Sequence, residues 1–181
     1  MSGLALKYSK KAFTAMKKDV HSHSAKLKRA GSRALNKTAV SGRKITVDEV
    51  RKEINIKAGA ARKQVSLRRS RPSTLKSVLL VKHKPIPLAA YAGVRQTKKG
   101  VSVQMMKSKP RKLFKGAFIA TMPSGHRGVY RRKGKGRLPI QELYGPNVQS
   151  VFVEKVLLIQ DKTLPVLEKN LDHEIRYELS K

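Results

Sequence analysis

The feature that most constrains this sequence is a long span without acidic residues. Residues 54–141 contain 23 lysines and arginines and no aspartate or glutamate, whereas residues 142–181 contain 7 acids and 5 bases. A span of this length cannot neutralise its charge by local ion pairs. Its bases must face solvent, the acidic stretch of the same or a neighbouring molecule, or another anionic partner.

The net charge of the whole chain narrows these possibilities. The 181 residues carry a formal charge of +31, and a compact body with that charge repels itself unless counter-charge is supplied. A basic surface that served solubility alone would not require the complete loss of acids from the span. We therefore expect a polyanion or an acidic protein surface as the partner.

Length and composition set further limits. A chain of 181 residues suits one domain with a single core. The absence of cysteine excludes disulfides and thiolate metal sites. No stretch approaches the roughly 20 apolar residues of a membrane helix, and the first residues lack the apolar segment of a secretory signal. We expect no membrane contact, and a protein that stays inside a cell or a particle.

Helical spacing dominates the first third of the chain. Apolar residues recur on one face over residues 9–20, and residues 24–40 are rich in alanine, lysine and leucine. Gly42 is expected to end this second helix. Thr46 and Glu49 have the spacing of a capping box, which predicts the start of a short third helix. Residues 57–71 are expected to form a helix or an extended arm.

After Pro72 the spacing of apolar residues changes from that of helices to that of β-strands. Residues 75–81 form a β-branched and leucine run of strand length. Residues 94–105 alternate on either side of a basic tip at 97–100, as a hairpin would. A second hairpin is expected from residues 117–122 and 128–132, and its last strand runs into a loop with two glycines.

Helical spacing returns beyond Pro139, with Thr163 as the expected N-cap and Pro165 in the first turn. One face of this helix carries Leu164, Leu167, Leu171, Ile175 and Leu179. Glu174 and Glu178 have the spacing of an ordinary helix surface. The order of elements predicts an α+β fold with N-terminal helices, central antiparallel hairpins and a C-terminal helix packed on the sheet.

We expect a basic helical region at 1–71, a basic hairpin region at 72–140 and a helical region at 141–181, together forming one domain. Catalytic patterns are absent from all three. Gly134-Lys135-Gly136 has neither the dinucleotide fingerprint nor the ending of a phosphate loop. His21 and His23 lie two residues apart on one expected helix and point in different directions, and Asp19 is the only carboxylate beside them. We therefore expect no enzyme activity, no metal and no cofactor.

Contact with phosphates or other anions fits the basic clusters better. The chain has nine aromatic residues and no tryptophan, and few of them lie against a basic run as Tyr130 does, so base stacking has little support. Short clusters of lysine and arginine suit contact with phosphates that does not depend on sequence. The candidate contact residues are Arg68, Arg69, Arg71, Lys98, Lys99, Lys112, Lys115, Arg131, Arg132, Lys133, Lys135 and Arg137.

Residues 116–140 resemble a known family. Gly116-Ala117-Phe118-Ile119, a short turn, Val129-Tyr130-Arg131-Arg132, a basic glycine loop and Leu138-Pro139-Ile140 are similar to the minor tail protein Z family of tailed bacteriophages and prophages. The Ala-rich basic helices before this segment and the helical C-terminus after it also resemble the family in order and length.

The resemblance implies a structural virion protein at the head-proximal end of the tail, present in the host cytoplasm during assembly. It implies a tail-completion or neck component that forms a ring, expected to be a hexamer, on the tail. The expected partners are the tail tube or terminator, the head–tail connector and DNA in the lumen. A second hypothesis from another class remains open: a nucleic-acid-binding protein of ribosomal or nucleoid type, without sequence preference.

Overall fold

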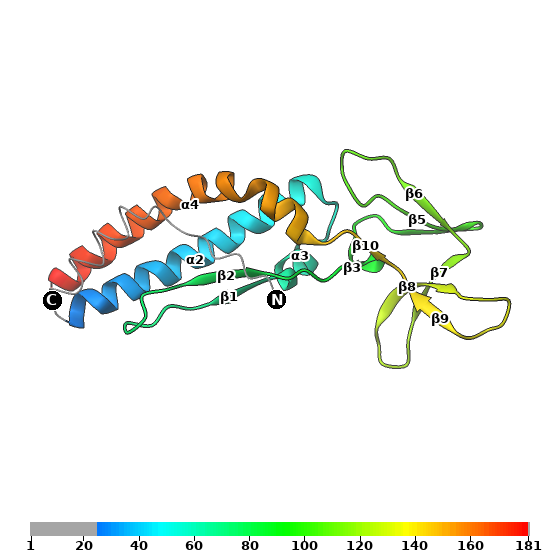
Figure 1. The fold of residues 1–181 in the computed structure, drawn as a ribbon, viewed down its shortest axis with the longest axis horizontal. Coiled ribbons are helices and arrows are strands. Elements are labelled where there is room, and N and C mark those ends of the chain that lie inside the picture. Colours follow the sequence, from blue (N-terminus) through cyan, green and yellow to red (C-terminus); the bar gives the residue numbers. More distant parts are fainter. Residues whose placement is uncertain (1–24, 181) are drawn as a thin grey trace. The chain divides into compact units, whose positions relative to one another are not determined.

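The computed structural model describes residues 25–180 of the chain (Figure 1). The helix expected over residues 9–20 lies outside this range. Along the sequence, the described chain begins and ends with a long helix and has several small antiparallel sheets between, so the predicted α+β class is confirmed. The chain divides into two compact units. The described part of the helical unit is residues 25–49, 65–81 and 152–180, and the sheet unit is residues 50–64 and 82–151.

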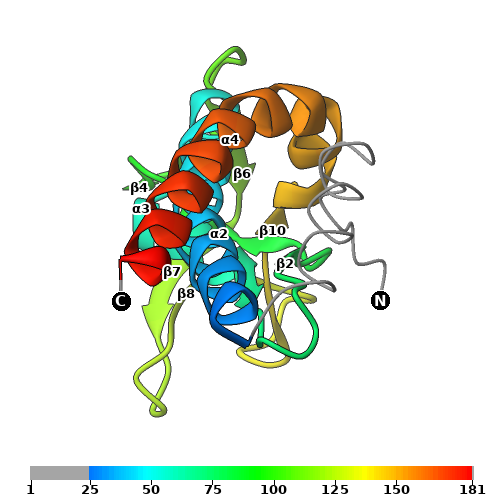
Figure 2. The same cartoon turned by 90° about the vertical axis from the view of Figure 1, so that its left-hand side faces the viewer.

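Two long helices form the body of the helical unit. Helix α2 (Ala25–Glu53) and helix α4 (Val148–Leu179) run antiparallel and side by side in both views (Figures 1 and 2). Their direction is fixed by polar contacts between the helices. Lys37 Nζ lies 2.5 Å from Glu174 Oε1, Asn170 Nδ2 donates to Thr38 Oγ1 at 3.0 Å, and Lys162 Nζ lies 2.5 Å from Glu49 Oε1.

A hairpin completes this unit. Strands β1 (Val65–Arg68) and β2 (Val78–Val81) pair antiparallel, with Val65 opposite Val81 and Arg68 opposite Val78. Strand β2 lies within the predicted 75–81 run. Strand β1 and helix α3 (Ala58–Gln64) replace the helix or arm expected over 57–71.

Gly42 is the point where helix α2, helix α4 and strand β2 meet. A Cβ atom at Gly42 would lie 3.3 Å from Thr163 Cγ2 and 3.4 Å from Leu79 Cδ1. The glycine therefore permits close packing instead of ending a helix. Helix α2 continues through Gly42 to Glu53, so the prediction of a helix end there was wrong. Burial of one helical face outweighs the weak intrinsic preference of glycine for non-helical backbone.

Both predicted threonine caps lie inside helices. The Thr46 hydroxyl donates to the Gly42 carbonyl at 2.8 Å, and the Thr163 hydroxyl donates to the Ile159 carbonyl at 2.6 Å. A buried threonine can satisfy its hydroxyl on the preceding helical turn, which sequence spacing does not distinguish from capping. The predicted starts at Thr46 and Thr163 were therefore wrong, and helix α4 contains Pro165 in its interior.

The apolar stripe expected on helix α4 is only partly buried. Leu167 is buried, Leu164, Leu171 and Ile175 are half-buried, and Leu179 is 72% exposed. Glu174 and Glu178, expected on the surface, are buried, with 3% and 6% exposure. The buried face thus combines apolar contacts with carboxylates that pair with helix α2.

The sheet unit is built from short antiparallel ladders. Strands β4 (Arg95–Thr97), β5 (Gly100–Val103) and β6 (Lys112–Lys115) form one sheet in that order. Strands β7 (Ala117–Thr121), β8 (Arg127–Arg132) and β9 (Ile140–Glu142) form the next. Both predicted hairpins are confirmed.

Two further strands precede helix α4, in a region expected to be helical. Strand β10 (Tyr144–Gly145) pairs with strand β3 (Ile86–Pro87), which is followed by the short 3₁₀ helix η1 (Leu88–Ala90). Strand β9 likewise lies beyond Pro139, so the helical region begins only at Val148. No helix between residues 25 and 180 combines the length and the apolar character needed to cross a membrane.

Side-chain amides and a buried tyrosine connect the ladders of the sheet unit. The Asn55 amide donates to the carbonyls of Ala92 and Gln104 at 3.3 and 3.2 Å. Tyr91 is fully buried, and its hydroxyl donates to the Pro146 carbonyl at 2.9 Å. Burial raises the pKa of Tyr91, so the hydroxyl keeps its proton and remains a donor.

Candidate anionic-partner interface

The sheet unit is strongly and almost uniformly basic. It contains 21 lysines and arginines but only two acids, Glu53 and Glu142, which gives a formal charge of +19. Glu53 already has an interaction within the protein. Two carboxylates cannot balance this number of bases, so the unit presents positive charge to whatever binds it.

The Glu142 carboxylate contacts a histidine and a tyrosine, and no lysine or arginine of the predicted contact residues. Its Oε1 atom lies 2.8 Å from His126 Nε2, and its Oε2 atom accepts a hydrogen bond from the Tyr144 hydroxyl at 2.8 Å. The hydrogen bond to Glu142, together with burial, raises the pKa of Tyr144. This carboxylate therefore fixes the end of strand β9 and leaves the predicted contact bases available.

The first group of predicted bases lies on the β4–β5–β6 sheet. Lys98 and Lys99 form the exposed tip of the hairpin, and Lys115 is opposite Gly100, so these three bases share one end of the sheet. Gly100 is required there, because its φ is 147° and a Cβ atom would lie 2.1 Å from the Phe114 carbonyl oxygen. Lys112, at the other end of strand β6, lies over the Phe114 ring at 5.6 Å.

The second group follows strand β8 into the loop before strand β9. Residues 131–139 are all exposed, including the five bases Arg131, Arg132, Lys133, Lys135 and Arg137. The Lys133 amide donates to the Pro139 carbonyl at 3.1 Å and closes the base of the loop. The Arg132 guanidinium lies 5.7 Å from the centre of the Phe118 ring. The charge is therefore carried at the end of strand β8 and on the loop that joins it to strand β9.

The third group, Arg68, Arg69 and Arg71, belongs to the helical unit, at the end of strand β1 and in the turn after it. These three residues are also exposed. The structure thus divides the twelve predicted contact residues into three separate groups and exposes every one of them.

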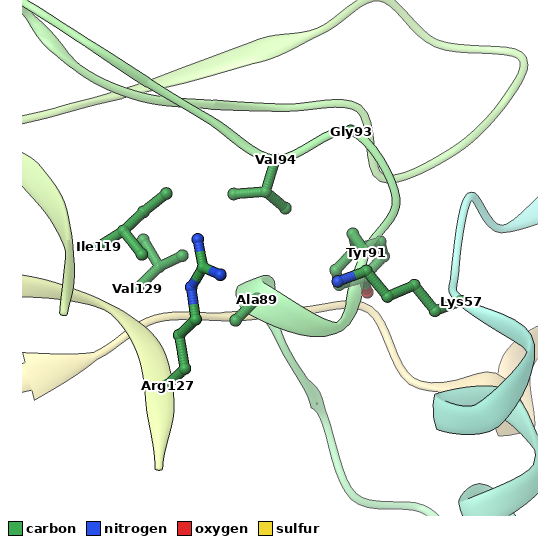
Figure 3. Close-up of a pocket in the computed structure, with 8 residues that line it drawn as sticks. All are labelled: Lys57, Ala89, Tyr91, Gly93, Val94, Ile119, Arg127 and Val129. Carbon is green, nitrogen blue, oxygen red and sulfur yellow. The ribbon is translucent and has the colours of Figure 1, made fainter. Parts of the chain in front are cut away.

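The sheet unit also contains a small pocket that the sequence did not predict (Figure 3). Its volume is about 270 Å³. It is lined by Lys57, Ala89, Tyr91, Gly93, Val94, Ile119, Arg127 and Val129. Figure 3 shows Arg127 extending from strand β8 past Ala89 and Val129, and Lys57 extending from the other side of the pocket near Tyr91.

The pocket combines two bases with an apolar floor. Its partly exposed apolar lining comes from Ala89, Val94 and Ile119, which are half-buried, whereas Tyr91 and Val129 are fully buried. Lys57 and Arg127 are exposed, and the lining contains no acid. Neither the Lys57 amine nor the Arg127 guanidinium forms an ion pair with another residue between 25 and 180. The arrangement suits an anionic group attached to an apolar one.

Comparison with known proteins decides the family. The family model for prophage minor tail protein Z (GPZ) matches residues 10–181. The chain belongs to this family. No curated protein and no solved structure matches it. The minor tail protein Z family assigns the chain to the structural proteins of phage tails, and so to the virion.

This family member contains no recognisable metal site in the part that the structure describes. Over residues 25–180, no three or more side chains of histidine, aspartate or glutamate come together as ligands. His126 is paired with Glu142, and His83 contacts Gln149. These contacts join neighbouring segments of the sheet unit, and a structural role is consistent with the family.

The pocket bases were missed because neither belongs to a cluster. Lys57 follows the buried Ile56 directly, and Arg127 begins strand β8, 70 positions later. A lysine beside an apolar residue, and an arginine between a histidine and a glycine, are patterns too common to identify a site. The pairing of the two bases depends on the fold.

Proposed function

We propose that this member of the minor tail protein Z family completes the tail at its head-proximal end. In this proposal copies form a ring, a hexamer, on the tail axis. They contact the tail tube or terminator on one side and the connector on the other, and their basic loops face these partners or DNA in the lumen. Family membership supports the tail role, and the sequence resemblance over residues 116–140 points to the finer position.

The distribution of charge is the observation that carries the proposal. All twelve predicted contact residues are exposed, and the sheet unit has 21 bases and two acids. Exposed lysines and arginines bind phosphates and carboxylates without requiring a specific sequence. A partner with dense negative charge satisfies this surface, and both DNA and acidic protein rings have that property.

Charge also explains why the tail would be needed for assembly. Six copies at +31 each would bring together a formal charge of +186. At about 0.15 M salt the Debye length is about 8 Å, so repulsion remains between loops that face each other at an interface. We expect the isolated protein to be monomeric or weakly associated near physiological salt, and to form a ring where the tail supplies counter-charge.

The proposal is tested with tails assembled in the absence of the protein. Purified protein is added to such tails, and attachment is measured by co-sedimentation and by electron microscopy of the tail ends. We expect wild-type protein at one end only. Replacing Arg131, Arg132, Lys133, Lys135 and Arg137 with serine is expected to weaken attachment at least about tenfold, since several charge-assisted contacts are lost.

A control variant removes the same charge elsewhere. Five exposed bases of the helical unit are replaced with glutamine: Lys26, Arg29, Lys44, Lys76 and Lys169. We expect this variant to attach like the wild type, because the loop is unchanged. Equal loss in both variants would mean that net charge, and not the loop, governs attachment. Failure of the wild-type protein to attach would overturn the tail-completion role.

DNA contact is measured separately. Each phosphate contact that the serine variant loses should reduce the slope of log K against log salt by about 0.9. An unchanged slope would exclude these five residues from DNA contact and leave an acidic protein as their partner. Tight binding of RNA or DNA by a protein that never attaches to tails would instead favour the ribosomal or nucleoid hypothesis.

A further inference from the structure

Helix α4 carries an exposed face that combines leucines with carboxylates. Glu154, Leu157, Leu158 and Asp161 are spaced i, i+3, i+4 and i+7, which places them on one side of the helix. Leu157 is 71% exposed and Leu158 40% exposed. Neither carboxylate forms a hydrogen bond or ion pair with another residue between 25 and 180. We call these four residues the acidic-apolar face.

The pocket formed around Lys57 and Arg127 has the complementary composition. It places two bases over an apolar floor, and its volume of about 270 Å³ lies just below the roughly 300–1,000 Å³ of pockets that bind drug-sized ligands. A protruding side chain such as leucine fits this space better than a cofactor does. The pocket therefore has the size and the charge to receive the acidic-apolar face of another molecule.

We propose that the acidic-apolar face of one copy docks on the Lys57–Arg127 pocket of a second copy. Leu157 enters the pocket, and Glu154 and Asp161 pair with the two bases. The carboxylate-bearing residues are separated by about 10.5 Å along the helix axis, from a rise of about 1.5 Å per residue, so they can bracket a pocket from either side. This inference rests on the proposed ring, for which it supplies a subunit contact.

The two surfaces are different, so the contact is head to tail. Each copy offers one acidic-apolar face and one pocket, and successive copies continue the same contact until it closes into a ring or extends as a filament. DNA is a poorer occupant of the pocket, because a phosphate would leave the apolar floor uncovered.

Charge reversal on each surface tests the contact. The pocket variant carries Lys57→Glu and Arg127→Glu, and the face variant carries Glu154→Lys and Asp161→Lys. Because the isolated protein is expected to associate only weakly, self-association is measured by sedimentation at high protein concentration and about 0.15 M salt, where the Debye length is about 8 Å and long-range repulsion is screened. We expect each variant alone to associate at least about tenfold more weakly than the wild type, because both ion pairs become repulsive.

Mixing the two variants is the decisive experiment. In the mixture, the unchanged acidic face of the pocket variant meets the unchanged basic pocket of the face variant. The reversed, basic face of the face variant likewise meets the reversed, acidic pocket of the pocket variant. Association is therefore expected to recover to the wild-type level. Recovery in a mixture requires contact between copies. Variants that associate as well as the wild type, or a mixture that does not recover, would overturn the proposed interface.

Leu157 has a matched control on the same helix. Leu157→Ser should weaken self-association, whereas Leu179→Ser, at a residue that is 72% exposed, should leave it unchanged. Equal effects of the two substitutions would contradict the insertion of Leu157 in the pocket.

Carbodiimide cross-linking examines the contact on tails that carry a mixture of isotopically light and heavy copies. We expect mixed-isotope links from Lys57 to Glu154 or Asp161, and their absence would overturn the interface. This outcome is independent of the tail-completion role, which is decided by attachment of the wild-type protein. Attachment without these links would leave the tail role intact and remove only this subunit contact.

Discussion

The helical unit and the sheet unit contain the same charged residue types and use them differently. The described part of the helical unit has 15 bases and 8 acids, and the sheet unit has 21 bases and two acids. In the helical unit, lysines and arginines of one helix pair with carboxylates of the other. Nine of the twelve predicted contact residues belong to the sheet unit, where they are exposed on hairpins and loops. Charge therefore joins the helices of the helical unit, where other charged residues remain exposed, and is almost wholly an external surface in the sheet unit.

The cluster around Glu174 shows how the structural use of charge works. The Glu174 side chain is 4% exposed and lies 2.7 Å from Arg33 and 2.5 Å from Lys37, whose side chains are 40% and 53% exposed. Burial alone would raise the pKa of Glu174, but hydrogen bonds from Lys37 and Arg33 outweigh it and lower the pKa overall. The carboxylate stays ionised and sets the register of helix α2 against helix α4.

The largest expected effect tests whether apolar packing supports the helical unit. Ile159 is fully buried in helix α4. Ile159→Ala is expected to reduce the free energy of unfolding by about 2–5 kcal/mol, because it removes buried methyl groups and leaves a cavity. Chemical denaturation of dilute protein measures this loss. Leu157→Ala, at a residue that is 71% exposed, is the control and should change stability by less than about 0.5 kcal/mol.

The next effect sharpens the difference between the two uses of charge. Glu174→Gln removes the buried negative charge and should cost about 1–3 kcal/mol, less than a fully buried pair because Arg33 and Lys37 still reach solvent. The control is Glu168→Gln, an exposed glutamate on the same helix. Similar stabilities for the two variants, measured by chemical denaturation, would mean that the Glu174 cluster is not structural.

The pH dependence of stability should follow the same carboxylate. The pKa of Glu174 in the folded protein lies below its ordinary value of 4.5. Its contribution to stability is therefore complete above pH 4.5 and is lost as the pH falls through the lowered pKa. Thermal denaturation between neutral and acidic pH should show a smaller decline in Glu174→Gln than in the wild type. Parallel curves would assign acid sensitivity to other groups.

The smallest expected effect concerns the sheet unit. Replacing Arg131, Arg132, Lys133, Lys135 and Arg137 with serine should change the free energy of unfolding by less than about 1 kcal/mol, the upper end for an exposed cation over an aromatic ring. Arg132 over Phe118 is the only one of the five with such a ring contact among the described residues. A variant that does not fold would show that the loop charges are structural after all.

The hairpins of the sheet unit could be predicted from sequence because their signals are local. Alternating apolar residues flank a two-residue turn at Lys98 and Lys99, and the Pro123-Ser124-Gly125 turn separates strands β7 and β8. The exposure of the basic loop could be predicted for the same reason, since a run of like charges is costly to bury.

The helix boundaries and the pocket could not be predicted, because they depend on contacts between distant residues. Glycine is common at the end of a helix and threonine at its start, but Gly42 and Thr163 are both buried where helices α2 and α4 meet. Glu174 looked like a surface residue because its partners, Arg33 and Lys37, are more than 130 positions away. Lys57 and Arg127 likewise come together only in the folded sheet unit.

Gln96 provides the link between the two larger sheets. Its Oε1 atom accepts a hydrogen bond from the Ile119 amide at 2.9 Å, and its Nε2 atom donates to the Ala117 carbonyl at 3.4 Å. One side chain thus takes the place of a peptide group along the outer edge of strand β7. An open strand edge is a template for pairing with another chain, and such pairing leads to aggregation. Gln96 closes this edge at its centre, so a neighbouring copy cannot extend the sheet there by backbone pairing.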